Sequence, residues 1–114
     1  MMAMGLLAVV VTTGLAVVAA TQVVTARARA VTAADAAALA AAAHTFPPLA
    51  GGVAPFQAAR LVAKANGARL ERCICPVVAA PQPRSVEVAV TTQVQVALLG
   101  TVEVGAASRA EYVP

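Results

Sequence analysis

The stretch TARARAVTAADAAALAAAAH, Thr25 to His44, decides the architecture of this 114-residue chain because it continues a membrane-length apolar run with alanine. Alanine has the highest intrinsic helix propensity, and Val31 and Leu39 are the only bulky apolar side chains within the stretch. A helix can therefore run on until Pro47 and Pro48 stop it. The sequence predicts one rod of about 40 residues, on the order of 60 Å at 1.5 Å per residue.

The segment before this stretch has the length and composition of a membrane span. The sequence MMAMGLLAVVVTTGLAVVAATQVV, residues 1–24, carries no charge and gives roughly 36 Å of helix against a hydrocarbon core of about 30 Å. The hydroxyl groups of Thr12, Thr13 and Thr21 can donate to carbonyls of the preceding turn, so these polar residues are compatible with a bilayer. We expect a membrane helix that is retained in the protein.

A cleaved secretory signal is the competing interpretation of the same segment. Small residues at Val18-Ala19-Ala20 and Ala26-Arg27-Ala28 resemble cleavage sites after an apolar region. A mature chain that begins at Thr21 or Ala30 would favour this interpretation. The stretch from Met1 to Met4 lacks the positive charge with which such a signal begins, which favours the retained helix.

The orientation of the span receives two opposing indications. Arg27 and Arg29 follow it, and the positive-inside rule would place the rest of the chain in the cytoplasm. The later part of the chain resembles an exported domain, so either the rule misleads here or a basic leader is missing from the front. We expect a single-pass protein of the cell membrane with an extracytoplasmic carboxyl-terminal domain.

The alanine stretch also predicts how the helix makes contacts. Alanine gains little from burial against water, but its small side chain lets another helix backbone approach closely. The helix-packing candidates for assembly with other chains are Ala34, Ala37, Ala38 and Ala41. The alternative is a solvent-exposed stalk whose alanines serve only helix propensity.

A Pro/Gly linker over residues 46–54 separates the long helix from a second, shorter one. The pattern predicts a helix over 55–66, because Pro55 fits a first helical turn and Asn66-Gly67 supplies a left-handed stop. Its expected apolar stripe consists of Phe56, Ala59, Val62 and Ala63.

The period changes to two beyond this helix, which indicates β-structure. Alternation over residues 86–98 predicts a half-buried strand, or a pair of strands broken near Thr91-Thr92-Gln93. Residues 69–75 and 101–110 are the expected antiparallel neighbours, and the helix at 55–66 is the expected cover of the buried face. The apolar face is expected to consist of Val86, Val88, Val90, Thr92, Val94, Val96 and Leu98.

These elements define an α+β chain of three parts. Residues 1–45 form the membrane-anchoring long helix, residues 46–54 the linker, and residues 55–114 a small α+β domain with an antiparallel sheet. Hydrophobic residues make up 61% of the chain but aromatic residues only 3%, so the sheet has few large side chains to bury. We expect its stability to be marginal without neighbouring subunits.

Few side chains in the sequence suggest chemistry. Cys73 and Cys75 lie two apart, at the limit of what a disulfide can bridge along a regular strand, so we expect free buried thiols or pairing with another chain. His44 is placed to cap the carbonyls at the end of the long helix. A single imidazole with two cysteines does not complete a zinc site or a hydrolase triad.

The charge pattern excludes further classes of function. The net charge of +3 is dispersed along the chain without interleaved aromatic residues, so a nucleic-acid surface is not expected. The sequence also lacks a glycine-rich phosphate loop. We expect no enzyme activity, no metal or other cofactor, and no small-molecule substrate.

The order and spacing of two runs resemble the small actinobacterial TadE-like proteins, which are encoded beside a helicase and secretion components of the Tad (tight adherence) pilus system. The first run, A-A-D-x-A-A-L-A-A-A, is matched by residues 33–42, and the second, A-N-G-A-R-L-x-x-C, by residues 65–73. Two departures stand out. Pilins usually carry a glutamate near the start of the mature helix, whereas the first here is Glu71, and relatives often have a cysteine where this chain has Phe56.

The resemblance implies a minor pilin or pseudopilin that is anchored by its helix and acts with other pilin-like subunits or Tad secretion components. Two other functions stay open from the sequence. The protein could be a small secreted binding domain released by signal peptidase, or a standalone membrane protein that modulates a secretion machine.

Overall fold

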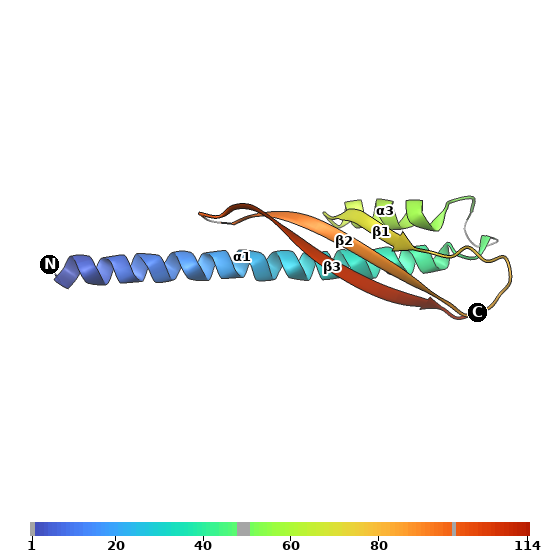
Figure 1. Ribbon diagram of the computed structural model, residues 1–114, viewed down its shortest axis with the longest axis horizontal. Coiled ribbons are helices and arrows are strands. Elements are labelled where there is room, and N and C mark those ends of the chain that lie inside the picture. Colours follow the sequence, from blue (N-terminus) through green and yellow to red (C-terminus); the bar gives the residue numbers. More distant parts are fainter. Residues whose placement is uncertain (1, 48–50, 97) are drawn as a thin grey trace.

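The computed structural model describes residues 2–47, 51–96 and 98–114, and it shows an α+β fold, as predicted. The molecule measures 75 × 20 × 15 Å, because one long helix projects far beyond a small sheet (Figure 1). The described elements are α1 (Met2–Ala43), α3 (Pro55–Ala65), β1 (Arg69–Ile74), β2 (Arg84–Val96) and β3 (Gly100–Tyr112).

Helix α1 confirms the predicted rod and runs without a break for 42 residues. Its threonine hydroxyls return to the backbone as expected. Thr12, Thr13 and Thr21 each donate to the carbonyl four residues earlier, at 2.7, 2.8 and 2.9 Å. These hydroxyl groups are therefore already satisfied when the helix enters an apolar environment.

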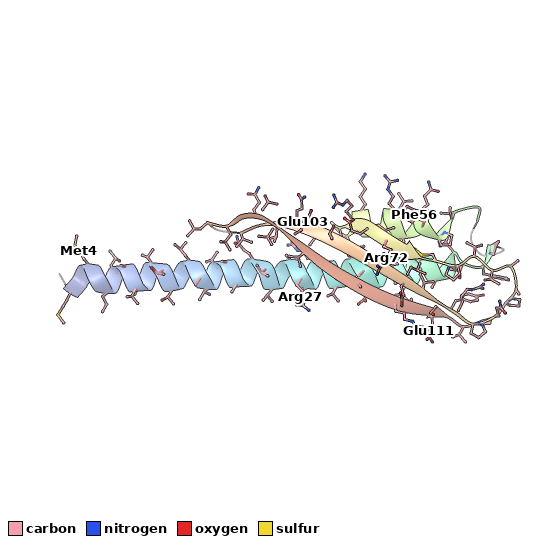
Figure 2. All side chains as sticks on the ribbon, viewed as in Figure 1. Met4, Arg27, Phe56, Arg72, Glu103 and Glu111 are labelled. Atoms are coloured by element: carbon pink, nitrogen blue, oxygen red, sulfur yellow. A yellow bond between two sulfur atoms is a disulfide. The ribbon has the colours of Figure 1, made fainter. Side chains whose placement is uncertain are left out.

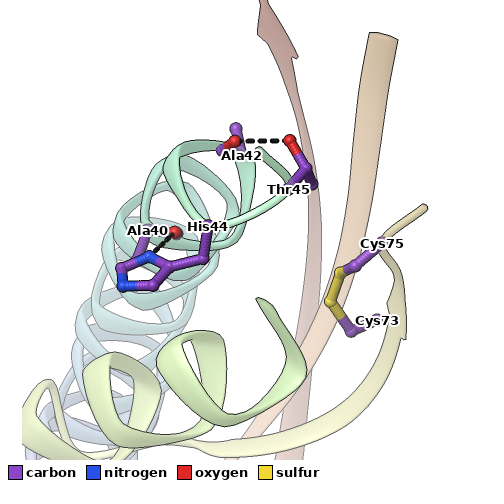
Figure 3. Close-up of a disulfide and its surroundings, with 6 residues drawn as sticks. All are labelled: Ala40, Ala42, His44, Thr45, Cys73 and Cys75. Atoms are coloured by element: carbon purple, nitrogen blue, oxygen red, sulfur yellow. Dashed lines mark hydrogen bonds between the residues drawn. A yellow bond between two sulfur atoms is a disulfide. The ribbon is translucent and has the colours of Figure 1, made fainter. Parts of the chain in front are cut away.

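The carboxyl end of α1 is closed by side chains (Figure 3). Nδ1 of His44 lies 2.8 Å from the carbonyl oxygen of Ala40, to which it donates, so the predicted capping role is confirmed. The buried hydroxyl of Thr45 donates to the carbonyl of Ala42 at 2.7 Å. The carbonyl of Thr45 in turn accepts a hydrogen bond from the amide of Val78, which ties the helix end to the loop after β1.

The linker is described only in part. Pro48, which was expected to help stop the helix, and residues 49–50 lie outside the described residues. Gly51 and Gly52 form a turn with φ of 60° and 82°, a left-handed conformation that glycine adopts without a steric penalty.

The sheet has three antiparallel strands in the order β1-β2-β3. The predicted neighbours of the central strand are confirmed. Strands β2 and β3 pair over their full length, from Arg84 opposite Tyr112 to Val96 opposite Gly100. Strand β2 therefore passes through residues 91–93 without the break that we considered. Strand β1 is shorter and has a bulge between Leu70 and Arg72.

The second helix packs on the sheet as predicted, at β1, but most of the buried face of the sheet is covered by α1, which was not expected. Val86, Val88 and Val90 of β2 are fully buried in one core with the inward alanines of α1. Helix α1 contacts both β2 and β3, whereas α3 packs beside it against α1 and β1. Alanines on α1 allow this cover because they add little thickness between the helix axis and the sheet.

Two residues are exposed although the sequence predicted them for apolar faces, Phe56 on the second helix and Leu98 on the central strand. Phe56 of α3 is half exposed, and the buried side of this helix consists of Pro55, Ala58, Ala59 and Ala63. Leu98 does not continue the alternation of β2, because the strand ends at Val96 and Leu98 lies in the turn before β3. Both exposed side chains lie where an element begins or turns, and there simple periodicity fails.

The cysteines form a disulfide with each other, so the predicted free thiols and pairing with another chain are both wrong (Figure 3). Strand β1 ends at Ile74, and Cys75 leaves the extended repeat. The Cα atoms of Cys73 and Cys75 consequently lie 5.4 Å apart, within the range of about 4.4–6.8 Å that a disulfide spans. Both residues are half-buried and pack against the core.

Candidate membrane and assembly surface

The amino-terminal half of α1 has an apolar surface that the rest of the chain leaves uncovered. Every residue from 2 to 18 is exposed, including Leu6, Leu7 and Val10. A helix that is apolar on all sides is stable only inside a protein or a membrane, and monomers in water rarely expose a contiguous apolar surface of this size. This half of the helix is therefore suited to a bilayer or to contact with partner helices.

The span ends where charge begins. Arg27 and Arg29 are the first charged residues, and cations at the end of a span lie at the level of the headgroups. Among the described residues, α1 is the one helix long and apolar enough to cross a membrane. A single amino-terminal helix of this kind fits either a single-pass anchor or a signal sequence.

In the carboxyl half of α1, the small alanine side chains are buried and larger apolar side chains are exposed. The predicted packing residues Ala34, Ala37, Ala38 and Ala41 are all fully buried, on one face, and belong to the core that includes the sheet and α3. Within this subunit, the close approach that their size permits is intramolecular. Their role in contacts between chains stays a prediction.

The bulky apolar residues between Thr25 and His44, Val31 and Leu39, are both exposed. The side chain of Leu39 is 65% exposed and that of Val31 is 43% exposed. The sequence analysis did not predict that these two residues are exposed. Their larger size, compared with the surrounding alanines, was the feature that could have singled them out. They are the exposed bulky apolar side chains of α1 beyond Arg29.

A hydrogen bond links the exposed side of α1 to strand β3. The hydroxyl of Ser108 on β3 donates to Oδ1 of Asp35 at 2.5 Å. Asp35 lies four residues before Leu39, so the polar contact and the exposed leucine are neighbours along the helix. Leu39 stays exposed because Ala37, Ala38 and Ala41 on the other side of the helix are buried in the core.

A small charged cluster occupies the outer side of the sheet, at the bulge of β1. Oε1 of Glu71 accepts hydrogen bonds from the hydroxyl of Thr91 at 2.8 Å and from Nε of Arg69 at 2.7 Å. These two hydrogen bonds hold the pKa of the Glu71 carboxyl below its ordinary value. The bond from Thr91 has the largest effect, and the bond from Arg69 has the next largest. The hydrogen bond and charge of Glu71 raise the pKa of Arg69.

This cluster predicts a pH dependence of stability. A depressed carboxyl pKa contributes stability above the unfolded pKa, about 4.3 for glutamate, and the contribution is lost as the pH falls through the folded value. We expect the gap in free energy of unfolding between the native chain and Glu71→Gln to shrink between pH 7 and pH 3. Urea unfolding at both pH values measures it. A gap that is equal at the two pH values would show that the carboxylate has no such role.

The residues with the most reactive side chains are engaged in structural contacts. His44 caps α1, and Cys73 and Cys75 are joined to each other. Among the described residues, no group of three or more histidine, cysteine or acidic side chains is arranged to hold a metal ion. The exposed apolar helix is the candidate functional surface.

Residues 1–44 match the Tad family model, described as putative Flp pilus-assembly TadE/G-like. The match ends at the cap of α1, so it covers the helix and not the sheet. The similarity of this helix is thus to a family described as acting in Flp pilus assembly. No curated protein sequence and no solved structure matches the chain significantly.

Proposed function

We propose that the protein is a non-catalytic, TadE-like minor pilin or pseudopilin that acts in Tad/Flp-type pilus assembly or secretion. The observation that carries the proposal is the division of one continuous helix. Its first half is exposed and apolar, and its second half is the core of a folded domain (Figure 1). A helix of this kind holds a small domain at a fixed distance from the membrane in which it is anchored.

The partners are other pilin-like subunits or Tad secretion components, and we propose that they contact the outward face of α1. Val31 and Leu39 are the bulky apolar side chains that α1 leaves exposed beyond Arg29. Ala34, Ala37, Ala38 and Ala41 support assembly from the other side, because their burial under the sheet determines which face is presented. The protein acts through contacts between helices and has no substrate or cofactor, and nucleic acid is not a partner.

The disulfide supports an extracytoplasmic location of the domain. Disulfides persist in oxidising compartments and are rare in the cytoplasm, where thiols are kept reduced. The Cys73–Cys75 bond therefore opposes the orientation that Arg27 and Arg29 indicate. We propose a single-pass topology in which residues 1–45 provide the anchor, residues 46–54 the linker, and residues 55–114 the outer domain that closes on the end of the anchor.

A secreted domain released by signal peptidase is the second candidate, and one observation favours it. Continuous burial in α1 begins only near Ala26, so cleavage before Thr21 would leave the core residues in place. The released domain would then be a binding module. The two candidates differ in the fate of residues 2–20.

Two matched leucines test the proposed assembly face. Leu39 on α1 and Leu61 on α3 are 65% and 62% exposed, so an aspartate at either position changes stability by only about 0.5 kcal/mol. We expect Leu39→Asp to reduce co-purification with pilin-like subunits at least severalfold, whereas Leu61→Asp leaves it unchanged. Both variants should stay in the membrane fraction. Equal co-purification of the two variants would contradict this assignment of the face.

A further inference from the structure

The turn between β2 and β3 exposes two adjacent leucines. The hairpin points along α1 toward its amino terminus (Figure 1). Leu98 is 85% exposed, the most of any large apolar side chain described outside α1, and Leu99 is 72% exposed. Hairpin turns in water usually consist of glycine, asparagine or aspartate. The folding of this hairpin gives no reason for a pair of leucines at its tip.

The backbone at this turn makes the choice of residue more unusual. Leu98 has φ of 68° and is the only non-glycine residue with a positive φ in the described part of the chain. A bulky side chain is disfavoured there, and glycine or asparagine would fit better. Unfavourable backbone conformations are kept where function needs them. The leucine is therefore explained by what its side chain contacts outside the subunit.

Both elements lose their charges at one level of the molecule. Arg27 of α1 and Glu103 of β3 lie at the same position along the long axis (Figure 2). Ala26 and Arg29 of α1 line one cavity together with residues 92–95 of β2, which places the two elements side by side at this level. Beyond it, α1 carries no charge as far as Met2, and the hairpin carries none over residues 94–102.

Charged side chains begin at this level in both elements. Arg27 and Arg29 follow the uncharged part of α1, and on the sheet a guanidinium nitrogen of Arg69, which is paired with Glu71, lies 3.7 Å from Oε1 of Glu103 at the base of the uncharged part of the hairpin. Arginine side chains in this position suit the phosphates of lipid headgroups. The charged level of the sheet thus coincides with the end of the span.

The hairpin is long enough to pass the headgroups. The strand from Glu103 to Leu99 reaches about 13 Å at roughly 3.3 Å per residue. The headgroup layer is about 6 Å thick on each side, half the difference between the full bilayer and its hydrocarbon core. The amide of Leu99 donates to the carbonyl of Val96 at 3.2 Å, so this group is already paired at the tip.

We propose that the Leu98-Leu99 turn inserts into the lipid leaflet next to the domain and forms a second membrane contact beside α1. The proposal rests on the anchoring role of α1 proposed above. Two contacts fix the tilt and rotation of the domain on the membrane. They thereby hold the face with Val31 and Leu39 at a constant orientation toward neighbouring subunits.

Tryptophan fluorescence tests the contact directly, because the chain contains no tryptophan. The test uses the full chain in phosphatidylglycerol–phosphatidylcholine vesicles with and without brominated acyl chains. Leu99→Trp reports the turn, and Val10→Trp reports the span. Val113→Trp is the matched control, because Val113 is 73% exposed at the opposite end of the domain.

We expect blue-shifted emission and loss of most of the fluorescence to bromolipid for Leu99→Trp and Val10→Trp, with no change for Val113→Trp. Quenching at Val10 without quenching at Leu99 would overturn the insertion and leave the anchor standing. Blue-shifted emission at Leu99 that bromolipid does not quench would assign the turn to a contact within or between copies of this chain and would also overturn the insertion. Loss of quenching at both positions would refute the anchor together with the insertion.

Discussion

Ala37→Leu combined with Ala41→Leu is expected to unfold the sheet domain at temperatures where the native chain is stable. Both alanines are fully buried in the core with Val86, Val88 and Val90. Inserting extra methylene groups into a close-packed core costs typically about 1–3 kcal/mol per site. Most domains have a total stability of about 5–15 kcal/mol, and this core has few large side chains with which to adjust.

Thermal unfolding in detergent, followed by circular dichroism of the sheet, measures this effect. Ala28→Leu is the matched control, because Ala28 lies on the exposed side of the same helix. We expect the control to melt like the native chain and the double variant to melt far lower. Equal melting temperatures would show that the sheet does not pack on the alanines. Lost co-assembly with unchanged melting would assign these alanines to contacts between chains.

Val10→Arg combined with Val11→Arg is expected to release the protein from the membrane fraction. Both valines are exposed in the middle of the uncharged part of α1. An arginine at the centre of a span costs about 2.5–3.5 kcal/mol on the insertion scale, so two remove most of the driving force for insertion. Carbonate extraction followed by immunoblotting of the pellet and the supernatant measures the partition.

Position within the helix provides the control for this prediction. Val24→Arg places a cation at the end of the span, where a long side chain reaches the headgroups. We expect this variant to stay in the pellet. If the variant at positions 10 and 11 also stays there, the segment does not anchor the chain by spanning the bilayer.

The helix and the strands could be predicted from the sequence because each has a strong local signal. Helix propensity up to the two prolines predicted the length of α1, and alternation over Val86 to Val96 predicted β2. What covers the sheet could not be predicted. An alanine helix has no apolar stripe, so its pattern does not mark a buried face. In this fold the small side chains point inward while Val31 and Leu39 point outward, the reverse of the usual rule.

Two further errors came from assuming regular strands. The distance that argued against a bond between Cys73 and Cys75 holds only if both residues are extended, and the strand ends between them. Leu98 fits the alternation by its position, but the chain turns before reaching it. In both cases the decisive fact is where a strand stops, and propensity alone does not set that point.

Intact mass with amino-terminal sequencing of the protein from its native membrane fraction tests the central claim most directly. The account predicts a chain that keeps the apolar segment up to Val24, so that one helix serves as both anchor and core. A chain that begins at Thr21 or later would contradict it, because the exposed half of α1 would then be absent from the mature protein.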